Sequence, residues 1–381
     1  MRIMMVNPLF KPYQGGIERH LYEVTSRLAR KHEVHVITAL LKGTAKEENI
    51  GGIKVHRCKS IVLTRLPKPL PPPYITSAHV KDLVLKFLTE VDIVHLHTRF
   101  FPEFSIPPLW YSKRIGKPVL LTLHNAKPKG ISLGIDLGAH IYDVIIGNFI
   151  LRNVDTLIAV SRYSAAVTVP KGFKGNVEIV PNGVDTTEFN PQVNGENIRS
   201  KYNNDYLLLY VGRLVKQKGL DYLIKAMNNI EDDAGLMVVG RGPELSHLKE
   251  LVWKLDLEKR IFFEGFVKDA LLPAYYAAAD VFVLPSLWEP FGMVLLEAMA
   301  TGRAIAASRV GGIPEILGGE AGLLFNPRDS YSITRTLNIL LSDESLRKNL
   351  GNNGRERALK YYSWEKVVEK LENVYNKVLS T

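Results

Sequence analysis

Short apolar runs alternate with helical stripes along the first half of the chain. The first apolar run covers residues 2–7, and a helical pattern follows from Ile17 to Lys31. Further strand patterns occupy residues 34–38, 53–57, 92–97, 118–125 and 155–160, and helices are predicted near residues 77–89 and 139–151. Short apolar strands that alternate with helices are typical of a parallel sheet with crossover helices. The stripe over residues 139–151 is strongly apolar, so we expect it to lie in the core.

The second half of the chain repeats this alternation. A strand pattern over residues 206–211 leads through a glycine turn to a helix from about Leu220. Further strands are predicted at residues 236–239, 261–267 and 280–286, and an amphipathic helix at residues 363–381. The proline-rich segment 66–74 interrupts the pattern, and its prolines predict an extended surface loop. The whole pattern predicts an α/β protein.

Length and composition place the chain among globular proteins. Its 381 residues predict two or three domains, and 46% hydrophobic and 23% charged residues are ordinary for this class. The single cysteine, Cys58, excludes an internal disulfide and a cysteine-rich metal site. No apolar run approaches the ~20 residues of a membrane span, and the first strand pattern is too short for a signal peptide. We therefore expect a cytoplasmic protein.

Positive charge is concentrated in the first half. Residues 1–185 hold 25 Lys and Arg against 14 Asp and Glu, a net charge of +11. Residues 186–381 hold 24 against 25, a net charge of −1. Such an asymmetry indicates an anionic partner, for which nucleic acid, an anionic membrane surface and a phosphorylated acceptor are the alternatives.

Two carboxylates lie where the strand at residues 280–286 is followed by a helix. Glu289 is at the carboxyl end of this strand, and Glu297 lies about two turns into the helix that begins near Phe291. Ligands of open α/β sheets bind at this edge. Gly292, in the first helical turn, leaves the free N–H groups accessible to an anion. The alternative interpretation is that Glu289 caps the helix and Glu297 is a solvated surface residue.

Other candidate residues also lie where predicted strands end. Arg213 and Lys218 flank a strand-to-helix turn with glycines, which suits a phosphate but also suits plain solvent. Gly15-Gly16 follows the first strand and is either a tight turn or a backbone surface that a sugar or phosphate can approach. His124 ends another strand, where a lone histidine is ordinarily structural.

These features resemble, in order and spacing, those of the family 4 retaining glycosyltransferases. Glu289 to Glu297 is similar to the E-x7-E signature of that family, and Arg213 and Lys218 match its G-R-…-K-G motif. Further family-like motifs are Gly15-Gly16, Thr122-Leu123-His124 and Gly311-Gly312. The resemblance covers essentially the whole chain. It implies the GT-B fold, an α/β fold with two facing Rossmann-like domains.

The resemblance also implies domain boundaries. Residues 177–185 resemble the family's interdomain segment. We therefore expect an N-terminal acceptor domain at residues 1–185 and a C-terminal donor domain at residues 186–362. The helix at residues 363–381 is expected to cross back and complete the first domain.

The same resemblance assigns roles to individual residues. Arg213 and Lys218 are expected to hold the departing diphosphate, and Glu297 the ribose hydroxyls. Glu289 and His124 are expected to face the donor sugar, with Arg213, Lys218, Glu289 and His124 counted as catalytic. The other expected substrate-binding residues are Gly15, Gly16, Arg241, Val267, Phe291, Gly292, Met293 and Val294, of which Val267 ends a strand that borders the nucleobase in relatives.

The implied reaction transfers a hexose with retention of its anomeric configuration. The expected donors, in this order, carry mannose or glucose on GDP or UDP. The leaving phosphate is expected to take the proton of the acceptor hydroxyl. No Asp-x-Asp motif occurs in the chain, and the acidic run Glu231-Asp232-Asp233 precedes a strand, far from the expected site. We therefore expect no metal and no cofactor. His95 and His97 show no third ligand at zinc-like spacing and are interpreted as packing or rim residues.

Three other functions compete with this one. A hydrolase would use Glu289 and Glu297 as its carboxylate pair. A nucleotide-sugar epimerase of the same fold would convert its substrate without an acceptor. A non-catalytic protein with two Rossmann-like lobes would bind the nucleotide or sugar only. A nucleic-acid partner is not expected for any of them.

The charge of the first domain predicts the kind of acceptor. Aromatic segments at residues 100–104 and 109–111 are expected to be the insertion side of a membrane-binding surface. The cations expected around them are Lys11, Arg65, Lys68, Lys113, Arg114, Lys127 and Lys129. This predicts peripheral binding to an anionic membrane and a lipid or lipid-linked glycan acceptor. A generically basic surface with a soluble acceptor is an equal alternative.

Overall fold

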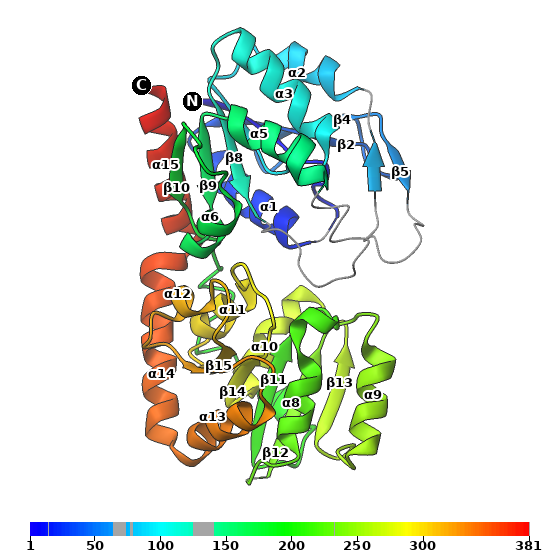
Figure 1. Ribbon diagram of the computed structural model, residues 1–381, viewed down its shortest axis with the longest axis vertical. Coiled ribbons are helices and arrows are strands. Elements are labelled where there is room, and N and C mark those ends of the chain that lie inside the picture. The colour runs from blue at the N-terminus through cyan, green and yellow to red at the C-terminus, as the bar shows by residue number, and fades with distance from the viewer. Residues whose placement is uncertain (14, 64–73, 77–78, 125–140, 232, 381) are drawn as a thin grey trace. The chain divides into compact units, whose positions relative to one another are not determined.

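The chain forms two compact units. The computed structural model describes residues 1–13, 15–63, 74–76, 79–124, 141–231 and 233–380. One unit consists of Met1–Pro181 with Val367–Thr381, and the other of Asn182–Lys366. Figure 1 shows the red end of the last helix beside strands coloured green, which belong to the first unit as well.

An eight-stranded sheet forms the first unit, in the order β10-β9-β8-β7-β1-β2-β4-β3. The strands are β1 (Arg2–Val6), β2 (Glu33–Ala39), β3 (Glu47–Ile50), β4 (Ile53–Cys58), β7 (Ile93–Leu96), β8 (Val119–Leu123), β9 (Thr156–Ala159) and β10 (Asn176–Ile179). Only β3 runs antiparallel to its neighbour. A separate antiparallel pair consists of β5 (Ile61–Leu63) and β6 (Tyr74–Thr76). β7, β8 and β9 are buried along their whole length, as continuous apolar runs predict.

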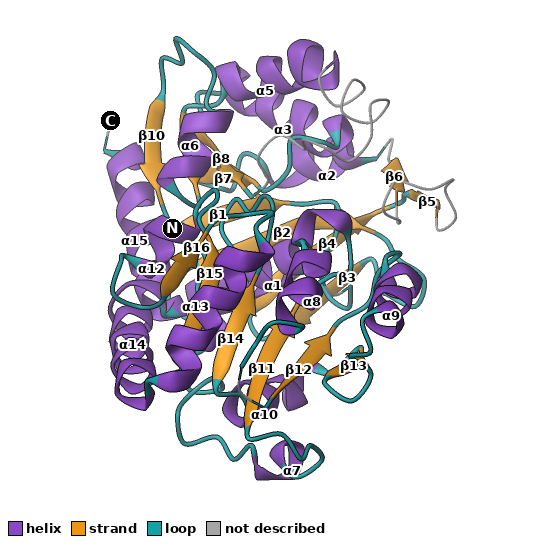
Figure 2. Cartoon of the chain, turned by 60° about the horizontal axis from the view of Figure 1, so that its bottom comes forward, coloured by secondary structure: helices purple, strands orange, loops and turns teal. Residues whose placement is uncertain are grey.

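Helices cover both faces of this sheet (Figure 2). They are α1 (Gly16–Leu28), α2 (Val80–Phe87), α3 (Pro102–Arg114), the π-helical turn η1 (Asp143–Gly147), α5 (Asn148–Asn153) and α6 (Arg162–Thr168). α3 packs against both α2 and α5. The predicted apolar stripe of α1 is confirmed, because Leu21, Val24 and Leu28 are fully buried.

The last helix, α15 (Trp364–Leu379), contributes to both units. Tyr375 is fully buried in the first unit, where its hydroxyl lies 2.7 Å from Nδ1 of His95. Trp364 packs in the second unit over Gly183, where an added Cβ would lie 2.5 Å from the indole ring. Residues from Val367 onward therefore complete the core of the first unit.

The division into units differs slightly from the expected boundaries. The expected domains end at residues 185 and 362, whereas the second unit extends from Asn182 to Lys366. The N–H of Val184 donates to the carbonyl of Tyr362 (2.8 Å), and Val184 also forms a parallel bridge with Ser363. This backbone pairing, which no side-chain pattern reveals, holds both short segments in the second unit.

The second unit contains a six-stranded parallel sheet in the order β13-β12-β11-β14-β15-β16. The strands are β11 (Tyr206–Val211), β12 (Ala234–Val239), β13 (Ile261–Gly265), β14 (Val281–Leu284), β15 (Ala304–Ser308) and β16 (Leu323–Phe325). The helices are α7 (Glu196–Arg199), α8 (Leu220–Met227), α9 (Leu245–Lys254), α10 (Leu272–Ala278), α11 (Met293–Ala300), α12 (Ile313–Leu317), α13 (Ser330–Ser342) and α14 (Glu344–Arg357). Strand orders of this kind place a switch point beside the first strand of each sheet.

The apolar helix predicted at residues 139–151 does not bury its stripe as expected. Ile141, Val144, Ile145 and Phe149 are 47–67% exposed, whereas Ile150 and Leu151 are buried in the core. A helix on the outside of a sheet buries one side only, and this segment is apolar nearly all round. The prediction of a core stripe is therefore wrong for these four residues.

The prediction that the aromatic segments insert into a membrane is also partly wrong. Phe104 and Leu109 point into the core of the first unit, with 0% and 2% exposure. Trp110 is 45% exposed, and Arg114 stacks on its ring at 3.9 Å. The proline-rich loop, Arg65, Lys68, Lys127 and Lys129 lie outside the described residues, apart from Tyr74. Within the described residues, each helix is either too short or too polar to cross a bilayer.

Candidate functional site

Glu289 forms a buried ion pair in the second unit. β14 ends at Leu284, and Glu289 lies on the loop that follows, before α11 begins. Its Oε2 accepts a hydrogen bond from Lys218 Nζ (2.5 Å) and one from Ser286 Oγ (3.4 Å), and the residue is 8% exposed. The N-cap residue of α11 is Gly292, so Glu289 is not the N-cap of this helix. The structure thus brings together two residues that are 71 positions apart.

Two tight turns hold this ion pair in place. Gly219 adopts a left-handed conformation (φ +64°), and a Cβ there would lie 2.3 Å from the carbonyl oxygen of Pro285. Gly311 (φ +56°) would place a Cβ 1.9 Å from the carbonyl oxygen of Glu289, which instead accepts the N–H of Gly312 (3.0 Å). Only glycine fits such close backbone approaches. The Gly311-Gly312 motif therefore positions the Glu289 loop.

The carboxyl ends of β11 and β12 carry two exposed cations. Arg213 follows β11, and its backbone carbonyl accepts the hydroxyl of Tyr210 (3.0 Å). Arg241 follows β12 and lies over the ring of Phe266 at 5.5 Å. A Cβ at Gly240 would lie 1.8 Å from the carbonyl of Gly212, so the two strand ends are packed tightly. With Lys218, these side chains make this edge of the sheet positive. Val267, which follows β13, is half-buried.

Glu297 is not a solvated surface residue. It lies on α11, is 6% exposed, and its Oε2 accepts a hydrogen bond from Tyr276 (2.8 Å). Phe291 and Gly292 are buried, whereas Met293 and Val294 at the start of α11 are half-buried. The structure therefore holds Glu297 on the same helix whose amino end was expected to bind the donor.

In the first unit, a histidine cluster lies where β7 and β8 end. Nδ1 of His97 is 3.0 Å from Nε2 of His124, and the ring of His20, on α1, packs edge-on against His124 at 4.7 Å. One nitrogen from each of the three rings lies within 4.8 Å of the others. The expectation that no third ligand accompanies His97 is wrong, because the partners come from elements far apart in sequence.

Burial keeps the imidazoles of His95, His97 and His124 neutral. Desolvation lowers the pKa of His97 and of His124 well below 6.5, and nearby histidines lower it further. It lowers the pKa of His95 to about 3. His95 bonds Tyr375 through Nδ1 and Thr122 through Nε2, both at 2.7 Å, so it is the packing residue that the sequence predicted.

Glu18 is a candidate functional residue that the sequence analysis missed. It is 8% exposed, and desolvation raises the pKa of its carboxyl. An added Cβ at Gly15 would lie 2.2 Å from its Oε2, so Gly15 makes room for this side chain, whereas Gly16 is exposed. Glu18 lines a cavity of about 90 Å³ together with His97 and His124. Its position two residues after the glycine pair was the available signal.

A buried ion pair supports the same cavity. Arg99, which also lines it, lies with Nε 3.2 Å from Oδ1 of Asp143, and both residues are less than 5% exposed. Tyr142 donates its hydroxyl to the carbonyl of Arg99 (2.5 Å). The start of η1 is thereby fastened to the loop after β7.

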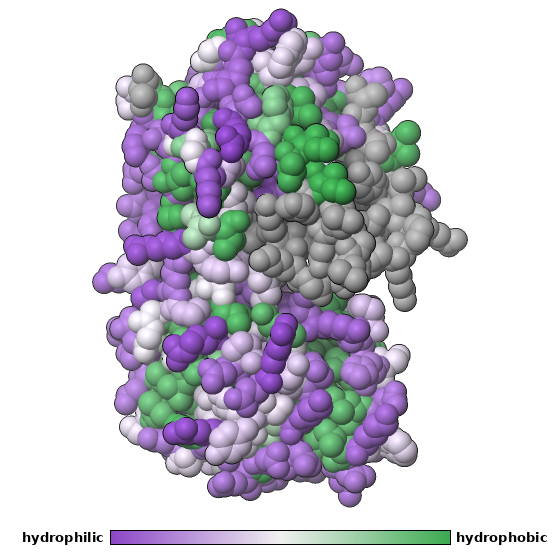
Figure 3. All heavy atoms as spheres, in the orientation of Figure 1, coloured by the Kyte–Doolittle hydropathy of each residue, from purple (hydrophilic) through white to green (hydrophobic). Residues whose placement is uncertain are grey.

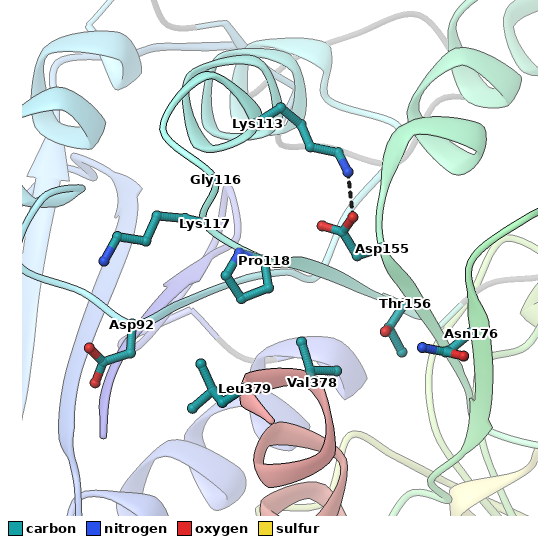
Figure 4. Close-up of a pocket in the computed structure, with 10 residues that line it drawn as sticks. All are labelled: Asp92, Lys113, Gly116, Lys117, Pro118, Asp155, Thr156, Asn176, Val378 and Leu379. Carbon is teal, nitrogen blue, oxygen red and sulfur yellow. Dashed lines mark hydrogen bonds and ion pairs between the residues drawn. The ribbon is translucent and has the colours of Figure 1, made fainter. Parts of the chain in front are cut away.

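A larger hollow of about 760 Å³ lies at the opposite edge of this sheet (Figure 4). It is bordered by the starts of β8, β9 and β10 and by Val378 and Leu379 at the end of α15. Lys113 is paired there with Asp155, which also accepts the N–H of Val119 (2.9 Å). Because it lies at the amino ends of the strands and its Asp155 is already satisfied, it is not the candidate site.

Two parallel-sheet units with these strand-end features define a glycosyltransferase of the GT-B fold. Residues 195–357 match the model of the family described as glycosyl transferases group 1, and residues 14–188 match that of glycosyltransferase family 4. The chain belongs to this glycosyltransferase family, as its resemblance implied.

Two relatives support this assignment, and one solved structure supports the fold. An uncharacterized glycosyltransferase of Methanocaldococcus jannaschii is 30% identical over 98% of both chains. The GDP-mannose-dependent alpha-(1-6)-phosphatidylinositol monomannoside mannosyltransferase of Mycolicibacterium smegmatis is 28% identical over 95% of both chains. The structure of Anabaena HepE in complex with UDP-glucose has a TM-score of 0.76 at 20% identity, covering 99% of this chain and all of HepE.

Proposed function

We propose that this enzyme transfers a hexose from a nucleotide sugar to the hydroxyl of a lipid or lipid-linked acceptor, with retention and without a metal. The observation that carries the proposal is the ion pair of Lys218 and Glu289 at the carboxyl edge of the second sheet, beside the exposed Arg213. This arrangement offers cations for a diphosphate and a carboxylate for a sugar on one set of loops.

The cations stabilise the leaving group. A lysine ammonium has three donors, and one of those of Lys218 bonds Glu289, so two are available for phosphate oxygens. Arg213 supplies a planar guanidinium for the same diphosphate. As the bond from the anomeric carbon to the phosphate oxygen breaks, these groups take up the developing negative charge. The phosphate oxygen accepts the proton of the acceptor hydroxyl, whose oxygen bonds the same face of the anomeric carbon.

The remaining residues position the donor. Glu289 accepts hydrogen bonds from sugar hydroxyls, and Glu297, held by Tyr276, accepts them from the ribose. A neutral His124 exchanges hydrogen bonds with the sugar without adding charge. The start of α11, Gly15, Gly16, Arg241 and Val267 complete the expected donor contacts. Glu289 and Glu297 have different partners, which disfavours their use as the carboxylate pair of a hydrolase.

The donor is tested first. The mannosyltransferase relative uses GDP-mannose, and the HepE structure holds UDP-glucose, which supports mannose or glucose as the sugar. A screen of GDP- and UDP-linked hexoses would measure nucleotide release with and without lipid acceptors. We expect release that depends on a lipid acceptor. Interconversion of UDP-GlcNAc with its epimer in the absence of an acceptor would favour the epimerase instead, and binding without turnover the non-catalytic protein.

An exposed apolar surface supports a lipid acceptor. Ile141, Ile145 and Phe149 follow one another at intervals of four residues in this helical segment, and Val144 adjoins Ile145, so the four share one side of it. The next exposed position on that side is Arg152. Figure 3 shows green surface on the first unit over this helical segment. Exposed apolar patches with cationic rims are typical of membrane-binding surfaces.

The positive charge around this surface complements an anionic bilayer. The first half of the chain carries +11, and Arg114 lies with Trp110 on α3, which packs against α5. Each basic residue near an anionic surface contributes ~1 kcal/mol of attraction. The enzyme would then act on its acceptor from the cytoplasmic face of the membrane.

Membrane binding is tested by co-sedimentation with vesicles. We expect bound protein to increase with the fraction of phosphatidylglycerol and to decrease with salt, because screening weakens the attraction. Replacing Ile145 and Phe149 by Glu should abolish sedimentation. The matched control replaces Val167 and Val177, two exposed apolar residues of the same unit, by Glu. Protein that stays in the supernatant at low salt would favour a soluble acceptor.

A further inference from the structure

The histidine cluster has the composition of a metal site. His20 comes from α1, His97 directly follows β7 and His124 directly follows β8. One ring nitrogen of each lies within 4.8 Å of the others. Ligand atoms on a tetrahedral zinc ion with bonds of about 2.1 Å are separated by about 3.4 Å. Small rotations of the rings therefore suffice to close them around one ion.

The cluster also contains a buried ring nitrogen that is not hydrogen-bonded within the part of the chain that the structure describes. Nε2 of His97 is buried and has no hydrogen-bond partner among the described residues. A buried ring nitrogen without a partner is a recurrent sign of an ion or water that belongs there.

The surroundings support the ring that would bind. His95 packs against His97 with ring centroids 4.2 Å apart, and hydrogen bonds to Thr122 and Tyr375 fix the orientation of His95. The cavity beside His97 and His124 has a volume of about 90 Å³, and Glu18 is among its lining residues. It has room for a water molecule as a fourth ligand beside the three imidazoles.

We infer that His20, His97 and His124 bind a transition-metal ion of the Zn²⁺, Co²⁺ or Ni²⁺ type, and that this ion inhibits the enzyme. Three imidazoles select such ions over Mg²⁺ and Mn²⁺, which prefer oxygen ligands. The site is distinct from the cations that stabilise the diphosphate, so it is not needed for the transfer. Inhibition follows because a ligated His124 no longer reaches the sugar. The inhibition rests on the proposed function, whereas the binding does not.

Metal binding is tested with the full chain after treatment with EDTA and buffer exchange. Titration with Co²⁺ should give a saturable visible absorption stronger than that of the aqueous ion, at one equivalent per chain. His20→Asn should weaken the affinity at least about tenfold, since even second-shell losses at metal sites reach that size. The control is His247→Asn, an exposed histidine in the second unit. Circular dichroism checks that each variant folds.

The outcomes separate the two halves of the inference. Absorption equal to that of aqueous Co²⁺, or an equal loss of affinity in His247→Asn, would overturn the site. Zn²⁺ should also lower the rate of nucleotide release, EDTA should restore it, and His20→Asn should need at least about tenfold more Zn²⁺ for the same fractional loss. Binding of one ion with an unchanged rate would overturn the inhibition and leave the site. An inactive enzyme that still binds Co²⁺ would count against the proposed function alone.

Discussion

At the scale of single residues, the proposed donor site depends on carboxylates that are buried with a hydrogen-bond partner. Glu289 is 8% exposed and bonded to Lys218, and Glu297 is 6% exposed and bonded to Tyr276. Removing the partner of a buried carboxylate strongly destabilises the folded protein, because an uncompensated charge stays buried. Variants of Lys218 therefore report on stability as well as on binding, whereas the exposed Arg213 reports on binding alone.

The first prediction concerns the diphosphate contacts. Arg213→Ala and Lys218→Ala should each remove a charge-assisted hydrogen bond of about 1.5–3 kcal/mol, which weakens nucleoside diphosphate binding by roughly 10- to 150-fold. Calorimetry measures the affinity, and thermal unfolding monitors the expected loss of stability in the lysine variant. Lys249→Ala, an exposed lysine on α9, is the control. Unchanged affinity in both variants would remove the diphosphate from this edge.

The second prediction concerns the sugar contacts. Glu289→Gln and His124→Ala should lower kcat more than they weaken binding of the free nucleotide, because these side chains are assigned to the sugar. Steady-state rates and calorimetry on the same preparations give the comparison. If the rate and the nucleotide affinity fall by equal factors, the two residues belong to the nucleotide pocket instead.

At the scale of elements, loops that glycine brings into close contact place the side chains. Gly219 packs on Pro285, and Gly311 packs on Glu289, so the loops after β11 and β15 both support the loop after β14. Short loops on buried parallel strands are rigid supports for a site. Their geometry, more than the length of α11, determines where the carboxylate lies.

The third prediction separates this contact from ordinary glycine strain. Gly311→Ala should lower the transfer rate at least about tenfold, because its Cβ would lie 1.9 Å from the carbonyl of Glu289. Gly319→Ala has the same kind of positive φ (+83°) with nothing within 4 Å, so it should lose stability by only about 1 kcal/mol and keep its rate. Rates and unfolding free energies measure both. An equal loss of rate in the two variants would contradict the positioning role.

At the scale of the whole molecule, the first unit combines a basic surface with a core rich in neutral histidines. Burial lowers the pKa of His56 to about 4 and that of His95 to about 3, and it lowers those of His97 and His124 as well. In the unfolded chain each has a pKa near 6.5. The unfolded state therefore binds more protons below that pH.

The fourth prediction follows from this difference. The unfolding free energy should fall as the pH is lowered from 6.5 towards 4, by up to about 1.4 kcal/mol per pH unit for each of these histidines. The raised pKa of Glu18 acts in the opposite direction, because its stabilising effect is lost as the pH rises above its unfolded value. Urea unfolding at several pH values measures the sum. A flat profile between pH 6.5 and 5 would contradict the assignment of neutral histidines.

The fifth prediction concerns metals in turnover. In the proposed reaction, cations and the amino end of α11 supply the positive field around the diphosphate, so EDTA should not lower the rate of transfer. The rate is measured before and after chelation with purified enzyme. Loss of activity that Mg²⁺ or Mn²⁺ restores would contradict a metal-independent reaction.

The sequence by itself determined the fold class, and it marked residues at the carboxyl ends of strands as candidates for a donor site. Buried parallel strands have continuous apolar runs, which locate Arg213 and Glu289 at strand ends, whereas their expected roles come from the family resemblance. Local signals of this kind survive without any tertiary contact. The family motifs added their spacing, which is also local.

Only the tertiary structure decided what depends on distant contacts. His20, His97 and His124 are brought together by three elements, and no spacing within one segment predicts that cluster. The exposure of Ile145 and the burial of Phe104 depend on which side of each helix meets the sheet, and apolar content alone does not reveal this. The division at Pro181 depends on the backbone pairing of Val184 with the chain near Ser363. Local patterns specify the elements, whereas packing between them selects which side chains meet.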